Sequence, residues 1–282
     1  IAFARPQWSS VTLAMTVFKV RRMAEILSPT RKASFEWLRD LEGDLRVEAH
    51  PKVRRENVTS DELLEAGESL FREAQNATRL KPKKQARLAR DGLMVALLSV
   101  RPLRRKNFTE LSLGSTLRHV NGRWWIILEA ADTKERRVDE KPVPQNIQQL
   151  LEIYLDIYRP ILLAKAIRER ESAPASSGAE AEPYAGRLWI GVTGQPITDP
   201  ALCATIKKTT QMTLGIRLSP HAFRRAAKAT STLFGGAHPR LAEGVLHHSS
   251  ARIGEEHYDS MSSRKAALAL TAIVRALTRE VD

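Results

Sequence analysis

The chain has 282 residues, with 45 Lys and Arg against 32 Asp and Glu and a formal net charge of +13. A surplus of this size favours a polyanionic partner, because each phosphate contact releases counterions, although charge alone also fits a merely basic protein. The single cysteine, Cys203, excludes an internal disulfide and a zinc site built on paired cysteines, and no apolar run approaches the ~20 residues of a membrane-spanning helix. We therefore expect a cytoplasmic protein with no membrane partner.

The first fifty residues predict two helices, over residues 8–27 and 33–47, each with an apolar stripe. The stripes consist of Val11, Met15, Phe18, Met23 and Ile26 in the first helix and Phe35, Leu38, Leu41 and Leu45 in the second. The polar, basic stretch that follows contains Pro51 and indicates a linker. Fifty residues are few for a domain of ordinary size. The expected division is part of a helical module over residues 1–52, a linker over 53–58 and a second domain over 59–282.

Two longer helices open the second domain. The run Thr59-Ser60-Asp61-Glu62 places acidic residues in a first helical turn, which predicts a helix to about residue 78. Another helix is predicted over residues 84–100. Its buried positions are Leu88, Met94, Leu97 and Leu98. Pro102 then ends or bends this helix, because proline cannot continue the hydrogen-bonding pattern.

Beyond this break the spacing of apolar residues changes. Residues 116–129 alternate and are rich in Trp, Ile and Leu, and Asn121-Gly122 between the two halves predicts a hairpin. A third strand is predicted over residues 136–143. Residues 144–168 return to helical spacing, residues 171–186 are predicted to form a surface loop, and helices are predicted from residue 199 onward. The fold class is therefore mainly α with a small antiparallel β-sheet.

The last quarter of the chain carries groups suited to cutting a phosphodiester. His221 and Arg224 lie one helical turn apart and share a face, and the guanidinium fork can grip two phosphate oxygens. A surface helix with a capping His is the alternative. His248 can also stabilise charge on a phosphate, and the Tyr258 hydroxyl can attack it to form a covalent link. Tyr258 also fits an ordinary core tyrosine.

Two cations upstream complete this set. Arg104 follows the helix break and can project from a turn beside a cleft. Lys134 falls at a predicted hairpin tip, where an amine can donate a proton to a leaving oxygen, although most such lysines are ordinary surface. The other basic residues near these groups are Arg101, Arg105, Lys106 and Arg225, which we interpret as solvated side chains able to contact phosphates.

A metal site is not expected. His247 and His248 are adjacent and point in different directions, and their spacing differs from the i, i+4 pair of a helical zinc motif. The chemistry of an attacking tyrosine held between cations needs neither a metal nor an organic cofactor.

The order and spacing of these residues resemble the tyrosine recombinase (phage integrase) family. The segment Pro102–Leu111 is similar to that family's first-arginine box, and Thr133-Lys134 is similar to its hairpin lysine. His221–Arg224 is similar to its His-x-x-Arg box, and Leu246–Ser250 to the box of its later histidine. Tyr258 follows His248 by ten residues, where the nucleophile is expected. The resemblance covers residues 58–265.

The sequence departs from the family pattern at four positions. Pro102 replaces a glycine and Asn107 an acidic residue of the first box, His247 replaces the glycine before the later histidine, and Arg225 stands where a second histidine is common. None of these changes removes a matched catalytic group. Arg101 remains an alternative to Arg104 as the first arginine.

The resemblance implies transesterification of DNA through a 3′-phosphotyrosyl bond formed by Tyr258. Arg104, Arg224 and His248 would bind the non-bridging oxygens, Lys134 would protonate the departing 5′-oxygen, and His221 would assist proton transfer or hold the phosphate. It also implies a catalytic domain preceded by a helical core-binding domain, which residues 1–52 would partly represent. The expected partners are a double-stranded DNA recombination site and three further copies of the chain, in a bacterial or phage-encoded mobile element.

The sequence alone leaves two questions open, the packing of the last helix and the class of protein. A last helix is predicted over residues 264–280, with Ala267, Leu270, Ile273, Val274 and Leu277 on one face. It either docks on a neighbouring protomer or packs on its own domain. The alternatives to a recombinase are a type IB topoisomerase, a catalytically silent DNA-binding protein of the same fold, and a generic basic helical protein with chance motifs.

Overall fold

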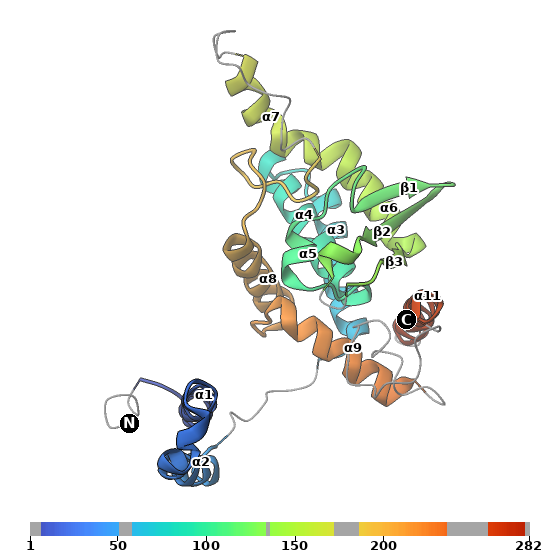
Figure 1. The fold of residues 1–282 in the computed structure, drawn as a ribbon. Coiled ribbons are helices and arrows are strands. Elements are labelled where there is room, and N and C mark those ends of the chain that lie inside the picture. The colour runs from blue at the N-terminus through green and yellow to red at the C-terminus, as the bar shows by residue number, and fades with distance from the viewer. Residues whose placement is uncertain (1–6, 51–57, 134–135, 172–185, 236–258, 280–282) are drawn as a thin grey trace. The chain divides into compact units, whose positions relative to one another are not determined.

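The structure is a computed structural model that describes residues 7–50, 58–133, 136–171, 186–235 and 259–279. The chain divides into two compact units, Ile1–Glu56 and Asn57–Asp282. Each unit is described by itself below (Figure 1).

The first unit is a pair of helices joined by a short 3₁₀ segment. Its elements are α1 (Ser10–Leu27), η1 (Pro29–Phe35) and α2 (Glu36–Val47). Ser9 caps α1, because its hydroxyl accepts a hydrogen bond from the backbone N of Thr12. A small core closes between the helices and consists of Leu13, Ala14, Val17, Leu38 and Leu45.

The predicted apolar stripe of the first helix is wrong. Val11, Met15, Met23 and Ile26 are exposed, whereas Leu13, Ala14 and Val17 face α2. The buried face continues through charged groups: Arg21 donates to Glu42 of α2 at 2.8 Å and also pairs with Glu25. Hydrophobic spacing missed this face because part of the contact is made by ion pairs.

The second unit is built around two helices that pack closely, α3 (Ser60–Asn76) and α4 (Pro82–Val100). The predicted start of α3 is confirmed, because Thr59 and Glu62 form a reciprocal capping box. Glycines allow the close approach of the helices. A Cβ on Gly67 would lie 2.4 Å from the backbone N of Ala96, so a larger residue there would force α3 and α4 apart.

The predicted hairpin is confirmed and extends into a three-stranded antiparallel sheet. The strands are β1 (Leu117–Val120), β2 (Arg123–Leu128) and β3 (Asp139–Pro142), in the order β1-β2-β3. Asn121 and Gly122 both have positive φ, 50° and 72°, as a two-residue hairpin turn requires. The third strand is shorter than expected.

The remaining elements of the second unit are helical. They are α5 (Arg105–Thr109), the 3₁₀ turn η2 (Ala130–Asp132), α6 (Gln145–Ile153), the π-helical turn η3 (Tyr154–Tyr158), α7 (Arg159–Glu171), α8 (Asp199–Leu214), α9 (Pro220–Phe234) and α11 (Asp259–Arg279). The fold class is thus mainly α with a small antiparallel sheet, as the sequence predicts. Within the described residues, no helix combines the length and apolar character needed to cross a membrane.

The C-terminal helix α11 packs on its own domain, where it lies against β3 and also contacts α3, α9 and α4 (Figure 1). Its inner face carries Ala267, Leu270 and Val274, all fully buried. The arrangement within one chain, which is one of the two that the sequence left open, is therefore compatible with the fold, and docking on a neighbouring protomer stays a prediction.

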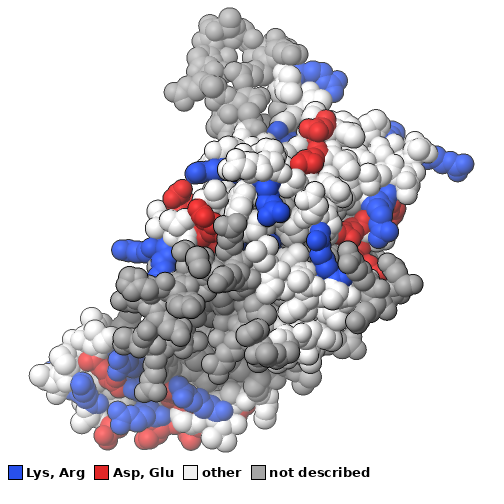
Figure 2. Space-filling view, turned by 90° about the vertical axis from the view of Figure 1, so that its right-hand side faces the viewer, with Lys and Arg blue, Asp and Glu red and all other residues white. Residues whose placement is uncertain are grey.

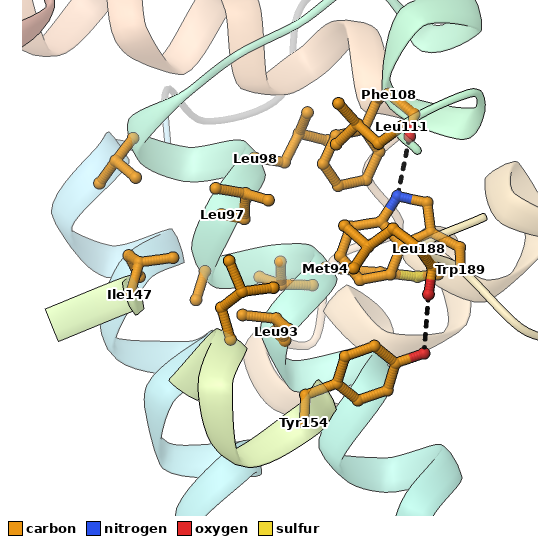
Figure 3. Packing of buried hydrophobic residues seen from close by; sticks show 14 of the residues in the cluster. Leu93, Met94, Leu97, Leu98, Phe108, Leu111, Ile147, Tyr154, Leu188 and Trp189 are labelled. Carbon is orange, nitrogen blue, oxygen red and sulfur yellow. Dashed lines mark hydrogen bonds between the residues drawn. The ribbon is translucent and has the colours of Figure 1, made fainter. Parts of the chain in front are cut away.

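The core of the second unit surrounds α4 and fixes the segments that follow it (Figure 3). The side chains from α4 shown there are Leu93, Met94, Leu97 and Leu98, which are all fully buried. The indole N of Trp189 donates to the carbonyl of Phe108 at 2.7 Å, and the Tyr154 hydroxyl donates to the carbonyl of Leu188 at 3.1 Å. Burial raises the pKa of Tyr154 to about 12, so this hydroxyl remains a donor. The end of α5 is thereby tied to the core.

Candidate functional site

A sharp turn joins α4 to α5 and carries the predicted first arginine. The backbone N of Arg101 closes the last turn of α4 on the carbonyl of Leu97 at 2.8 Å, and Pro102 prevents its continuation. The backbone N of Leu103 then returns to the carbonyl of Arg101 at 2.7 Å. Arg104 is the N-cap residue of α5, and its side chain is partly exposed. The turn therefore projects Arg104 from the end of a buried helix.

Helix α9 carries the predicted His-x-x-Arg pair, and its buried face explains how the pair is oriented. Phe223 is fully buried, and the Thr230 hydroxyl accepts a hydrogen bond from the backbone N of Ser60 at 2.8 Å, which fixes α9 on the start of α3. His221 is exposed in the first turn of α9, and Arg224 is partly buried one turn later.

The structure joins Arg224 to the turn that carries Arg104. One guanidinium N of Arg224 donates to the carbonyl of Pro102 at 2.9 Å, across 122 positions of sequence. Since Pro102 lies two residues before Arg104, two arginines from distant segments meet at one short stretch of backbone. A guanidinium group suits a phosphate, because it can donate to two oxygens.

Three further predicted site residues, Lys134, His248 and Tyr258, lie outside the described residues. The entry to the segment that carries Lys134 is described. The Asn107 side-chain amide of α5 donates to the carbonyl of Asp132 at 3.2 Å. The Thr133 hydroxyl donates to the carbonyl of Arg137 at 2.7 Å and accepts from its backbone N at 2.9 Å. The position that is acidic in the family pattern thus holds an amide suited to a backbone carbonyl.

Three of the four residues predicted to contact phosphates are exposed: Arg105, Lys106 and Arg225. Arg105 also forms an ion pair with Asp199 at 2.9 Å, and the exposure of both side chains makes this pair weak. On the face drawn in Figure 2, basic side chains are interspersed with acidic and uncharged ones. Among the described residues of that face, the basic side chains do not form one continuous patch.

Arg101 corrects one expectation, because it is fully buried and not part of a solvated basic turn. Its Nε and one Nη donate to the carbonyl of Pro142 at 2.9 and 2.6 Å. The other Nη donates to the carbonyl of Val100 at 2.7 Å, to the Thr271 hydroxyl at 3.0 Å and to the carbonyl of Ala267 at 3.3 Å. Because the Arg101 guanidinium is occupied by internal acceptors, it is not available to a phosphate. Arg104 is therefore the arginine of this turn that can bind one.

A buried ion pair in β3 lies close to these arginines and was missed in the sequence. The ammonium of Lys141 bonds the carboxylate of Asp139, and the two residues are 2% and 4% exposed. Burial lowers the pKa of Lys141, and the charges of Arg101 and Arg224 lower it further, while Asp139 opposes both effects. Burial likewise lowers the pKa of Arg101 to about 9, against the opposing charge of Asp139, so this guanidinium stays protonated at neutral pH.

The signal that could have revealed this pair is the strand register. Asp139 pairs with Leu128 of β2 and Lys141 pairs with Ile126, and both of these apolar partners are buried. The alternation of β3 therefore turns the two charged residues inward. The sequence predicts a strand over residues 136–143 but did not lead to an assignment of its inward face.

Replacing Lys141 with Met is expected to lower the free energy of unfolding by about 3 kcal/mol, because it leaves the buried Asp139 carboxylate without its ammonium partner. Urea denaturation measures the loss, and the exposed neighbour Glu140 provides the control Glu140→Gln, which should change stability by less than about 0.5 kcal/mol. The double variant Asp139→Asn/Lys141→Met should recover part of the loss. A Lys141→Met protein as stable as the parent would contradict the pairing.

The ion pair of Lys141 and Asp139 also predicts how the stability of the protein changes with pH. Folding lowers the pKa of Lys141 below its ordinary value of 10.5, so between the two values the unfolded chain binds more protons than the folded one. The stability of the parent relative to Lys141→Met should therefore rise as the pH rises toward 10.5. Urea titrations of both proteins at several pH values measure this difference.

The described residues contain no group of three or more His, Cys, Asp or Glu side chains that could hold a metal ion. The groups that converge in the described part of the site are cationic, and such groups suit an anion.

Comparison with known proteins finds similarity at the level of structure. No family model and no curated protein matches the sequence. The chain is similar to a crystal structure of the XerH site-specific recombinase bound to difH substrate in a pre-cleavage complex, with 17% identity, a TM-score of 0.42, and coverage of 71% of this chain and 49% of that chain. It is also similar to a post-cleavage complex of XerH with a palindromic difH substrate, with 12% identity, a TM-score of 0.41, and coverage of 98% and 72%. At such identities the likeness concerns the fold alone.

Proposed function

We propose that this chain is a tyrosine-type site-specific recombinase that cuts and rejoins DNA through a 3′-phosphotyrosyl intermediate. The observation that supports this most directly is the hydrogen bond from Arg224 to the carbonyl of Pro102. It brings the arginines of two sequence motifs, Arg104 and Arg224, to one turn. Chance matches to separate motifs would have no reason to meet there.

In the proposed reaction the Tyr258 hydroxyl oxygen attacks the scissile phosphorus and gives up its proton to a general base, a role for which His221 is a candidate. The new phosphorus–oxygen bond to Tyr258 replaces the bond to the 5′-oxygen, and Lys134 supplies the proton that this leaving oxygen takes up. A 5′-hydroxyl from a partner strand then attacks the phosphotyrosine, and the tyrosine leaves. The number of phosphodiester-type bonds is conserved at each step, so the reaction needs no external energy source.

The arginines act on the charge that develops during each displacement. Arg104 and Arg224, with His248, would donate to the non-bridging oxygens and stabilise the pentavalent transition state. His221 lies exposed one turn before Arg224 and is placed to assist proton transfer or to hold the phosphate. Because Arg224 is partly buried, its interaction with an oxyanion is screened less than that of a surface cation.

The partners follow from the proposed chemistry. We assign a double-stranded DNA recombination site as substrate, four protomers as the active assembly and no metal or cofactor. The net charge of +13 supports a nucleic-acid partner. The helical unit Ile1–Glu56 would also contact the DNA. We place the protein in the cytoplasm of a bacterium, encoded by the chromosome, a phage or another mobile element.

The test is a search for a covalent protein–DNA adduct. The protein is incubated with nicked suicide substrates made from pooled fragments of the source DNA, and the products are separated under denaturing conditions. A denaturation-resistant adduct is the expected result. Retained DNA binding without any adduct across the pool would favour a catalytically silent binding protein, and relaxation of supercoiled DNA without strand exchange would favour a type IB topoisomerase.

A further inference from the structure

Arg101 joins three separate parts of the second unit through one fully buried guanidinium. Its own residue ends α4, its Nε and one Nη hold the carbonyl of Pro142 in β3, and the other Nη reaches α11. A buried cation is costly unless it is surrounded by acceptors. Arg101 meets this condition only while β3 and α11 are both in place.

The backbone from Arg101 to Arg104 has little freedom to absorb a displacement. Pro102 has a fixed φ, and the bond from the backbone N of Leu103 to the carbonyl of Arg101 closes the turn. The carbonyl of Pro102 also accepts the hydrogen bond from Arg224. Movement of the Arg101 guanidinium would therefore shift the Pro102 carbonyl, and with it both Arg104 and Arg224.

The contact with α11 is made by two specific acceptors. Arg101 donates to the Thr271 hydroxyl at 3.0 Å and to the carbonyl of Ala267 at 3.3 Å, and Thr271 also donates to that carbonyl at 2.8 Å. The rest of the contact between α11 and the domain is apolar, because Leu270 and Val274 are fully buried on the same face of α11. Withdrawal of α11 would therefore remove these two acceptors and expose this apolar contact at the same time.

We propose that Arg101 is a positioning residue that couples the seating of α11 to the geometry of Arg104 and Arg224. With α11 packed against the domain, every nitrogen of the guanidinium donates to an internal acceptor, and the turn keeps Arg104 near the backbone carbonyl that Arg224 holds. With α11 withdrawn, the turn relaxes and the two arginines no longer converge. The proposal rests on the proposed function, in which these arginines bind the scissile phosphate.

Three variants separate this role from general stability. Arg101→Gln removes the charge and the fork, Arg101→Lys keeps the charge, and Thr271→Val removes one acceptor on α11 with little change in shape. The matched control is Arg159→Gln, because Arg159 is also buried and its Nε and one Nη also share one backbone carbonyl, that of Arg187, at 3.1 and 2.7 Å. Arg159 is the first residue of α7 and does not belong to the turn that holds Arg104.

The first readout is the rate of adduct formation at saturating DNA, corrected for the folded fraction. A small misplacement of catalytic groups is costly, so Arg101→Gln and Thr271→Val should slow the reaction by about 10- to 100-fold and leave the Kd for DNA unchanged. Arg101→Lys should recover part of the rate. Arg159→Gln should lower Tm and leave the rate unchanged. A parental rate in both Arg101→Gln and Thr271→Val would overturn the proposal.

The second readout is amide hydrogen exchange in the full chain without DNA. Thr271→Val, which alters only α11, should raise exchange both in α11 and in residues 103–109, whereas Arg159→Gln should raise it in neither. A rise confined to α11 would also overturn the proposal. If the parent protein forms no adduct, the proposed recombinase function fails, and exchange alone then decides whether α11 and the turn are coupled.

Discussion

The variant Tyr258→Phe is expected to form no covalent adduct with DNA while it binds DNA as the parent does. The change removes only the hydroxyl oxygen, which is the atom that would bond to phosphorus. Arg104, Arg224 and the basic surface remain to hold the phosphate backbone, so the affinity should persist. Denaturing electrophoresis with a suicide substrate measures the adduct, and an equilibrium titration at fixed salt measures binding.

Tyr158→Phe is the matched control for this experiment. Tyr158 is 4% exposed and packs edge-on against Phe71, with ring centroids 5.8 Å apart, so the same chemical change falls in the core. The control should keep its adduct. If Tyr258→Phe still cleaves DNA, the nucleophile has been assigned to the wrong residue, and loss of adduct in both variants would point to a stability effect.

The elements that sequence could predict are those fixed by local chemistry. The capping box of Thr59 and Glu62 determines the start of α3, and Asn121-Gly122 determines the hairpin, because each works through neighbours in the chain. The helical spacing of α4 correctly predicted that Met94, Leu97 and Leu98 are buried, although every residue from Gly92 to Val100 is buried and this half of the helix has no exposed side. These features need no knowledge of the rest of the fold.

The roles of Arg101 and Arg104 could not be separated in this way. Both lie at the end of the same helix, and the sequence favoured Arg104 as the site residue but assigned Arg101 to a solvated basic turn. The difference between them depends on acceptors from distant segments, the carbonyl of Pro142 and the hydroxyl of Thr271, which lie 41 and 170 positions away from Arg101. Propensity and periodicity carry no information on such contacts.

Charged residues caused the other failures for a related reason. On α1 the buried face is completed by Arg21 and Glu25, and in β3 it is completed by Asp139 and Lys141. Hydrophobic patterns place such residues outside, because burying a charge without a partner is costly. In the first case Arg21 pairs with Glu25 of the same helix and with Glu42 of α2, and in the second case both partners lie on one face of the same strand. Strand alternation could have raised the second possibility.

Arg104→Ala is expected to reduce the rate of adduct formation by about 10²- to 10³-fold, the effect typical of removing one preorganised donor from a developing oxyanion. The fold should tolerate the change, because Arg104 is partly exposed and makes no side-chain capping bond to α5. Arg104→Lys should recover little of the rate, since a lysine ammonium cannot supply the two parallel donors of a guanidinium. Single-turnover cleavage of a nicked substrate measures these rates.

Two further variants serve as comparisons for Arg104→Ala. Lys106→Ala removes an exposed charge from the same short helix and should affect only the salt dependence of DNA binding. Arg101→Ala should lower Tm, because it empties a buried site, yet slow the chemistry of the folded fraction less than Arg104→Ala does. The opposite ranking of the two arginine variants would mean that the first-arginine motif is aligned one helical turn out of place. In that case Arg104 would not bind the phosphate, and the hydrogen bond from Arg224 to the carbonyl of Pro102 would have only a structural role.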